Sequence, residues 1–290
     1  MYGKEKFARI NTLLNRRFEE KKALIAVHRG SWGGNIIENT VPAFRCALDM
    51  GADMFEVDVS CSTDGVLYAF HDGGEWRLFH CLQNIKTMPS TQIEAYSCCN
   101  CLGEDSGQHV QRIEEVVAAF DGGELYNIDR SWFWGLDKLD AVLSRHPHTQ
   151  QQAVIKTPVK QEYLEFFNAC PNKYMYMPIV YSMEEVRQVL SYPDINVVGA
   201  EVIAFTPDHE LFQQENLDWI RAQGLYLWVN VIKLGTPDRF RLFTDLDDDN
   251  ALADPQRTAW RAVLDRGVGV LQTDWPLQAS CLRDAYFAGK

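Results

Sequence analysis

Two histidines, an arginine and two acidic residues stand near the ends of apolar segments of this chain. His28 and Arg29 follow an apolar run, Glu56 and Asp58 alternate within "FEVDV", and His71 follows "YAF". A pair of carboxylates suits a hard cation such as Mg²⁺ or Ca²⁺, because acids that converge without one repel each other. Imidazole can act as general acid or base near neutral pH, and guanidinium binds phosphate. The residue types therefore indicate metal-assisted phosphate chemistry, with water-capped polar strand ends as the alternative.

The segments that carry Asp58 and His71 predict a β-hairpin. Residues 54–60 and 66–71 are separated by a turn containing Asp64-Gly65, and a parallel crossover would need a dozen residues or more. If Asp64 and Gly65 are the two turn residues, Asp58 lies directly opposite His71 on one face of the hairpin. A longer turn would shift this register. Strand alternation adds Glu56 to the same face, so two carboxylates and a histidine are expected to converge.

The elements that would position these residues alternate between strand and helix. Apolar runs predict nine strands, at 23–28, 54–60, 66–71, 125–129, 153–156, 174–180, 197–204, 226–231 and 268–273. Amphipathic patterns predict helices that include 38–50, 113–120, 136–145, 183–190, 209–223 and 258–266. Because the arm at 66–71 must return antiparallel, eight parallel strands remain. This is the strand count of a (β/α)8 TIM barrel, whose active sites lie at the carboxyl ends of the strands.

The whole chain, residues 1–290, is expected to form one barrel domain. An N-terminal helix is predicted at about residues 4–21, where the pattern is charged and helical. Residues 73–112 show little periodicity and are expected to form a loop or lid insertion near the carboxyl-terminal mouth of the barrel.

Composition limits the partners of the protein. The formal net charge of −12 argues against a nucleic-acid partner, which needs a basic face. No segment approaches the roughly 20 apolar residues of a membrane span, and the N-terminus lacks the apolar core of a signal peptide. A cytoplasmic location is therefore expected, with the eight cysteines reduced. The sequence leaves the oligomeric state open.

Five segments resemble the glycerophosphodiester phosphodiesterase family in their order and spacing. They are "HRG" at 28–30, "ENTVPAF" at 38–44, "GADMFEVDV" at 51–59, "TDGVLYAFHD" at 63–72 and "TDWP" at 273–276. The resemblance covers most of the chain and implies a (β/α)8 barrel that cleaves phosphodiesters of glycerol with a divalent cation, Mg²⁺ or Ca²⁺. It also implies that His28 and His71 are the catalytic histidines, that Glu56 and Asp58 are metal ligands, and that Arg29 contacts the phosphate.

Several departures from the family pattern bear on this site. Where relatives carry Glu-x-Lys, this chain has Asp129 as the third metal ligand and Ser131 at the lysine position. Arg130 is not expected to replace that lysine, because an adjacent strand residue points to the other face. Lys156, at the tip of the following strand, is the candidate to restore the charge, or else a solvated loop lysine. Trp228 stands one place later than the tryptophan of relatives, so the substrate pocket that it is expected to line differs.

The sequence thus predicts a metal-dependent hydrolase that converts a glycerophosphodiester to glycerol phosphate and an alcohol. It leaves open which histidine is the acid and which the base, and whether water or a neighbouring substrate hydroxyl attacks first. One alternative is the same chemistry on a sugar phosphodiester or a lysophospholipid, since the stretch after residue 72 differs from relatives. Another is a non-catalytic barrel that binds phosphodiesters, since the Glu-x-Lys pair is lost.

Overall fold

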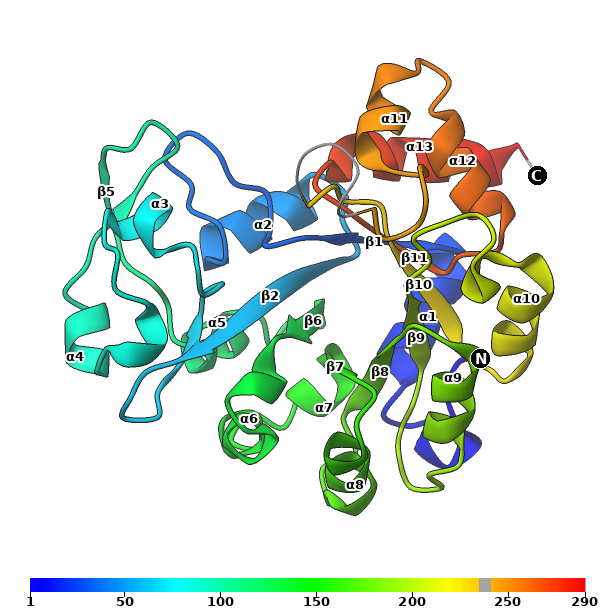
Figure 1. Cartoon of the computed structure of the whole chain (residues 1–290), viewed down its shortest axis with the longest axis horizontal. Coiled ribbons are helices and arrows are strands. Elements are labelled where there is room, and N and C mark those ends of the chain that lie inside the picture. Colours follow the sequence, from blue (N-terminus) through cyan, green and yellow to red (C-terminus); the bar gives the residue numbers. More distant parts are fainter. Residues whose placement is uncertain (235–240, 290) are drawn as a thin grey trace.

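The fold is a closed barrel of parallel strands, seen in a computed structural model that describes residues 1–234 and 241–289 (Figure 1). Within these ranges the barrel has eight parallel strands: β1 (Leu24–Val27), β2 (Met54–Cys61), β6 (Leu125–Asp129), β7 (Ala153–Pro158), β8 (Met175–Val180), β9 (Gly199–Val202), β10 (Tyr226–Asn230) and β11 (Val270–Thr273). They are hydrogen-bonded in that order, and β1 pairs with both β11 and β2, which closes the barrel. The predicted (β/α)8 architecture is confirmed.

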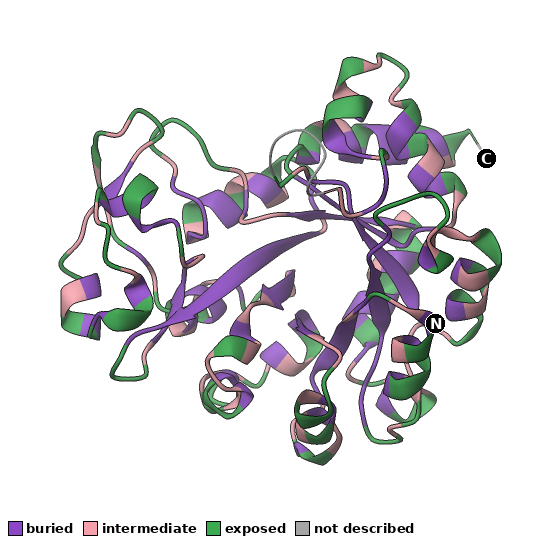
Figure 2. Cartoon of the chain, viewed as in Figure 1, coloured by how far each residue is buried: buried purple, intermediate pink, exposed green. Residues whose placement is uncertain are grey.

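Helices surround the barrel and bury one side against it, whereas the strands are buried along almost their whole length (Figure 2). The longer helices are α1 (Thr12–Lys21), α2 (Val41–Asp49), α5 (Ile113–Ala119), α6 (Leu136–Leu143), α8 (Gln161–Ala169), α9 (Met183–Leu190), α10 (Gln214–Ala222), α12 (Thr258–Asp265) and α13 (Pro276–Ala288). Shorter helical turns are η1 (Glu5–Phe7), η3 (Ser131–Phe133), α7 (Thr149–Gln152), η4 (Glu210–Phe212) and α11 (Asp248–Ala253). The segments predicted as single helices at 4–21 and 209–223 are each divided into a 3₁₀ turn and an α-helix.

The hairpin after β2 exists, but its register differs from the prediction by one residue. β3 (Leu67–Ala69) runs antiparallel to β2, with Cys61 opposite Leu67 and Val59 opposite Ala69. This register places Asp58 opposite Phe70, whose N–H donates to the Asp58 carbonyl at 3.0 Å. The predicted pairing of Asp58 with His71 is therefore wrong.

The reason is the length of the turn. Residues 63–65 form a three-residue loop between Ser62 and Val66, and Gly65 has a positive φ of 89°. Such a loop shifts the register by one position from a two-residue turn. Because β3 ends at Ala69, strand alternation no longer fixes the direction of His71, which can still turn toward the barrel mouth.

Residues 73–112 form a folded lobe at the end of the extended β2 (Figure 1). The lobe contains α3 (Glu75–Phe79), η2 (Ile85–Thr87), α4 (Ser90–Ile93) and the two-stranded sheet of β4 (Cys98–Cys99) and β5 (Asp105–Gln108). It shares an apolar core with the hairpin and with Ile37; the core is made of Ile37, Tyr68, Phe70, Leu78, Phe79, Ile85, Met88, Ile93, Cys98 and Val110. Aperiodic apolar residues therefore pack into a small core in this segment, for which the sequence predicted a loop or lid insertion without assigning it secondary structure.

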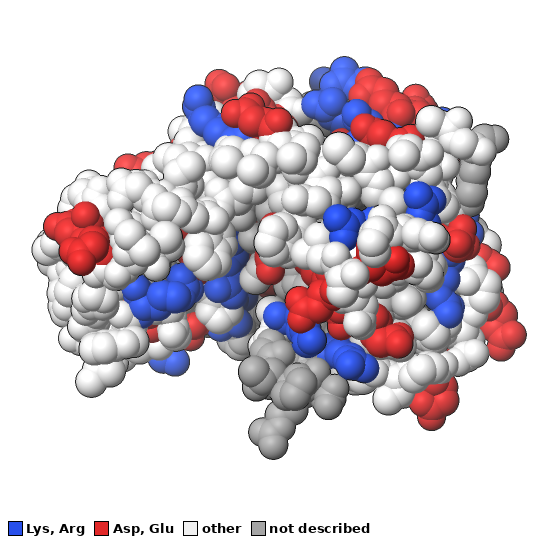
Figure 3. All heavy atoms as spheres, turned by 90° about the horizontal axis from the view of Figure 1, so that it is seen from above, with Lys and Arg blue, Asp and Glu red and all other residues white. Residues whose placement is uncertain are grey.

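Figure 3 shows a largely uncharged surface on one face of this lobe, while acidic and basic side chains are interspersed over the barrel part of the same view. None of the helices in the described ranges combines the length and the hydrophobicity that crossing a bilayer requires.

Candidate active site

A cavity of about 280 Å³ lies at the carboxyl ends of the barrel strands, where TIM barrels carry their active sites. Strands β1, β2, β6 and β7 and the segments next to them contribute mostly charged side chains: His28, Arg29, Asp58, His71, Asp129, Arg130, Trp132 and Lys156. The later strands contribute mostly apolar ones: Ile179, Tyr181, Glu201, Ile203, Asn230, Ile232, Leu234, Leu242 and Gln272. The cavity thus has a charged half and an apolar half.

Asp58 and Asp129 of the charged half form an acidic cluster with Glu56, which is fully buried and does not itself line the cavity. One oxygen from each carboxylate lies within 4.8 Å of the others. β2 and β6 pair with Asp58 opposite Asp129, and strand alternation puts Glu56 on the same face as Asp58. Burial, and then the charge of Asp58, raise the pKa of Glu56, and the buried Glu56 Oε1 has no hydrogen-bond donor in the described part of the chain. Such an oxygen beside two more carboxylates fits a hard divalent cation.

Arg29 pairs with two buried acids beside this cluster. Its Nε lies 2.9 Å from Asp58 Oδ2, and its Nη1 donates to Glu38 Oε1 at 3.2 Å. Asn39 Nδ2 also donates to Asp58 Oδ2, at 3.0 Å. Burial alone would raise the pKa of Asp58, but Arg29 and then the two histidines of the cavity lower it overall. Asp58 is therefore held in its ionised form.

The glycine after Arg29 is required by close packing. Arg29 and Gly30 both have positive φ, at 58° and 76°. A Cβ on Gly30 would lie 2.7 Å from the backbone carbon of Ala43 in α2, closer than any side chain tolerates. The tight turn at the end of β1 is what directs His28 and Arg29 into the cavity.

His28 is oriented by an acid that directly follows the last strand. Its Nδ1 lies 3.1 Å from Asp274 Oδ1. Burial would lower the pKa of His28, but the bond to Asp274 and the charge of Glu56 raise it overall. Asp248 positions this acid, since its carboxylate accepts hydrogen bonds from Asp274 N and Thr273 Oγ1, each at 3.0 Å. The sequence prediction did not assign Asp274 to the site, although it lies within the quoted "TDWP".

His71 lines the same cavity, and its Nδ1 lies 2.7 Å from the carbonyl oxygen of Asp72. Burial lowers the pKa of His71, and Arg29 and Arg130 lower it further against the opposing charge of Asp58. In both histidines Nδ1 thus lies beside an oxygen that can only accept a hydrogen bond. This arrangement favours the tautomer that leaves Nε2 as the nitrogen for a substrate.

Lys156 is buried between two acids rather than solvated. Its Nζ lies 2.8 Å from Asp129 Oδ2 and 3.1 Å from Glu201 Oε2. Burial would lower the pKa of Lys156, but these two carboxylates raise it overall. Asn230 Nδ2 donates to Glu201 Oε1 at 2.6 Å. Glu201 and Asn230 were not predicted as site residues, although a single acid inside the apolar run "VVGAEVIAF" is a signal that could have identified Glu201.

The structure corrects two expectations. Arg130 lines the cavity, because its left-handed backbone, with φ of 63°, ends strand alternation after Asp129. Trp228 is not among the described residues that line the cavity. Its side chain is fully buried one layer deeper in the barrel, where Nε1 donates to Asn230 and Gln272 at 3.0 Å, because residues 228 and 230 are successive inward positions of β10.

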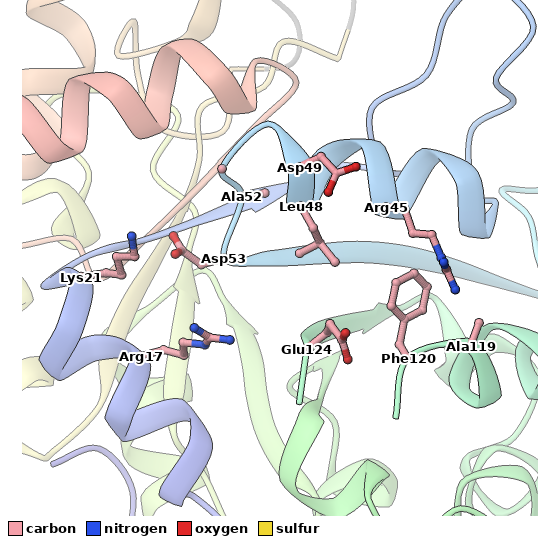
Figure 4. Close-up of a pocket in the computed structure, with 11 residues that line it drawn as sticks. Arg17, Lys21, Arg45, Leu48, Asp49, Ala52, Asp53, Ala119, Phe120 and Glu124 are labelled. Atoms are coloured by element: carbon pink, nitrogen blue, oxygen red, sulfur yellow. The ribbon is translucent and has the colours of Figure 1, made fainter. Parts of the chain in front are cut away.

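A second cavity, of about 630 Å³, lies at the amino ends of the strands (Figure 4). Charged side chains of both signs surround it: Arg17, Lys21, Arg45, Asp49, Asp53 and Glu124. None of the predicted site residues lines it. This end of a TIM barrel serves stability rather than catalysis, so volume alone does not identify the active site.

Known proteins resemble this chain in sequence and in fold. The glycerophosphoryl diester phosphodiesterase family profile matches residues 28–229. A glycerophosphodiester phosphodiesterase from Bacillus subtilis is 28% identical over 71% of this chain and 75% of that protein. A lysophospholipase D from Rattus norvegicus is 24% identical over 64% of this chain and 58% of that protein.

Solved structures show the same fold. A glycerophosphoryl diester phosphodiesterase from Parabacteroides distasonis superposes with a TM-score of 0.71 at 18% identity, over 91% of this chain and 86% of that one. An Oleispira antarctica phosphodiesterase, in complex with the product sn-glycerol-3-phosphate, has a TM-score of 0.64 at 16% identity, over 90% and 96% of the two chains. Fold and family together define a phosphoric diester hydrolase. The chain belongs to the glycerophosphoryl diester phosphodiesterase family.

Proposed function

We propose that the protein hydrolyses a glycerophosphodiester to glycerol phosphate and an alcohol, with a divalent cation held by Glu56, Asp58 and Asp129. The observation that carries this proposal is that Asp58 and Asp129 line one cavity with two histidines and Arg29, while the buried Glu56 clusters with these two carboxylates. When bound, such a cation polarises a phosphoryl oxygen. Mg²⁺ and Ca²⁺ both prefer carboxylate oxygens, so either suits this donor set.

In the proposed mechanism His28 and His71 exchange protons with the substrate. One Nε2 accepts the proton of the attacking hydroxyl, and the other donates a proton to the departing alkoxide. Asp274 orients the ring of His28, and the Asp72 carbonyl orients that of His71. Arg29 binds the phosphate while remaining paired with Asp58.

Lys156 takes a supporting role in this proposal. It offsets the repulsion between Asp129 and Glu201, and its ion pair holds the Asp129 carboxylate in position beside Asp58. The lysine on β7 thus supplies a charge that Ser131 lacks.

The apolar half of the cavity favours a second candidate, the same hydrolysis of a lysophospholipid. Ile179, Ile203, Ile232 and Leu242 offer a surface to an alcohol or glyceryl group that carries an apolar chain. The rat relative is named a lysophospholipase D.

Turnover of a panel of diesters, measured by product release with Mg²⁺ or Ca²⁺, tests both candidates. The panel contains glycerophosphodiesters without an acyl chain, a lysophospholipid and a sugar phosphodiester, and the Asp58→Ala variant serves as the inactive control. Preferred turnover of acyl-free glycerophosphodiesters supports the first candidate, and preferred turnover of the lysophospholipid supports the second. Absence of turnover across the panel with either ion would contradict both and favour a binding barrel.

A further inference from the structure

Arg130 occupies an unusual place at the end of β6. Its backbone has φ of 63° and ψ of 0°, a left-handed conformation that side chains other than glycine, asparagine and aspartate rarely adopt. Its N–H donates to Asp129 Oδ1 at 2.6 Å, which holds this turn in place. As a result the side chain points into the cavity beside His71 and Lys156. Strained backbone of this kind is concentrated at functional sites.

The guanidinium of Arg130 is only partly satisfied. Nη2 forms an ion pair with Asp72, and the group lies 5.0 Å from the centre of the Phe133 ring. The side chain is 24% exposed, yet Nε is buried and meets no acceptor in residues 1–234 and 241–289. A buried donor without an acceptor is unfavourable, so a ligand oxygen that supplied one would be bound well.

The other two permanent cations of the cavity are more heavily engaged. Lys156 lies between Asp129 and Glu201, and Arg29 lies between Asp58 and Glu38. Arg130, in contrast, has one ion pair within residues 1–234 and 241–289, with Asp72. An anionic ligand therefore meets less competition from protein carboxylates at Arg130 than at either of the other cations.

We propose that Arg130 is a substrate-binding residue, which donates from its guanidinium to an oxygen of the phosphodiester on the His71 side of the cavity. This inference rests on the proposed function of the site. It gives this chain a phosphate-binding cation next to Ser131. The turn at Arg130 thus adds a second cation to the one that Lys156 supplies in place of the lysine that Ser131 replaces.

The test compares Arg130→Ala and Arg130→Lys with Arg145→Ala, a matched control whose exposed arginine pairs with Glu114 on the surface. Calorimetry with sn-glycerol-3-phosphate, in the presence of the activating cation, measures binding, and steady-state kinetics measures KM and kcat. Arg130→Ala is expected to weaken binding and to raise KM by about 10- to 100-fold, the usual effect of losing a charged hydrogen bond. Arg130→Lys should recover part of the loss, and Arg145→Ala should match the parent.

Asp72→Asn separates this role from a merely structural one. It keeps the guanidinium but removes the ion pair that could hold His71 through Asp72. If Arg130 only anchored Asp72, Arg130→Ala and Asp72→Asn would lower kcat equally without weakening phosphate binding, and that result would overturn the proposal. We expect Asp72→Asn to bind sn-glycerol-3-phosphate at least as tightly as the parent does, because it removes a carboxylate that competes for Arg130. Thermal melting checks that each variant is folded. If Arg130→Ala does not fold, Arg130→Gln takes its place.

The inference and the proposed function can fail separately. A parent protein that turns over a diester, together with an Arg130→Ala variant of unchanged affinity and KM, refutes the role of Arg130 alone. A parent that turns over no diester, but loses phosphate binding in Arg130→Ala, refutes the proposed function and retains Arg130 as a phosphate-binding residue.

Discussion

At the amino end of the barrel Asp53 forms an ion pair with the buried Arg283, whereas at the carboxyl end Glu56 and Asp58 lie together in a cluster of acids. The Asp53 carboxylate accepts hydrogen bonds from Arg283 and from the N–H of Ile25. Glu56, in contrast, keeps a buried oxygen without a donor among the residues that the structure describes. Both acids come from the same strand region, only three residues apart, and burial raises the pKa of both.

The difference teaches how to distinguish a structural charge from a functional one. A buried acid that serves stability is neutralised by a partner from the same chain, because an uncompensated charge would cost several kcal/mol. A buried acid that serves binding is left incompletely satisfied, and the ligand supplies the missing interaction. Substitutions of these acids and their partners at the carboxyl end should therefore lower activity, and substitutions at the amino end should lower stability.

The largest effect is expected from removing the proposed cation site. Exhaustive chelation, or replacement of Asp58 or Glu56 by alanine, should abolish metal binding and turnover, because the loss of one of three carboxylates removes a ligand and charge compensation together. Metal content per protein and product release are the measurements. A fully active protein after chelation would show that this end of the barrel works without a metal.

His28→Ala and His71→Ala should each lower kcat by about 100- to 10,000-fold, the usual contribution of general acid–base catalysis. The kcat of the double variant should be little lower than that of the less active single variant, because neither half of the proton transfer is useful alone. Steady-state kinetics and a thermal melt of each variant make the comparison. Near-normal turnover in a folded single variant would refute the assignment.

At the amino end Arg283→Ala should destabilise the fold by about 3–5 kcal/mol, because it leaves Asp53 buried without its cation. Denaturant unfolding measures this loss, and kcat of the folded fraction should stay unchanged. The double variant Arg283→Met with Asp53→Asn is the matched control. It should lose less stability than Arg283→Ala, because it removes both charges of the pair. A variant that kept its stability but lost activity would break the contrast between the two ends.

Asp248 should make stability depend on pH. Burial raises its pKa from about 3.8 to about 7, so the folded state holds the proton more tightly than the unfolded state. The resulting stabilisation is complete below pH 4 and is lost as the pH rises through about 7. The free energy of unfolding of Asp248→Asn, compared with that of the parent, should therefore rise by about 2 kcal/mol from pH 5 to pH 7, because only the parent loses this stabilisation. Urea unfolding at both pH values tests this, and parallel stability curves for the two proteins would contradict it.

Strand spacing and local motifs predicted most of the barrel and of the charged half of the cavity. His28, Glu56 and Asp58 could be placed because each lies in or directly after a strand whose alternation is readable from apolar residues. The elements of the lobe at 73–112 could not be predicted, because they are short and lack periodicity. Their apolar side chains form a core only where they pack on β3. Arg130 was misplaced because the alternation rule holds only as far as the strand continues.

The sequence by itself determined the fold class, the order of the barrel strands and the identity of the residues at their carboxyl ends, because these follow from local patterns of period two and 3.6. Only the tertiary structure decided which partners those residues have. Glu201 lies 45 residues from Lys156, Asp248 lies 25 residues from Thr273, and Asp274 lies 246 residues from His28, and the folding of the barrel brings each pair into contact. A carboxylate that looks the same in the sequence becomes a structural partner at Asp53 and a candidate ligand at Glu56, because burial and the nearest cation depend on the packing of distant segments.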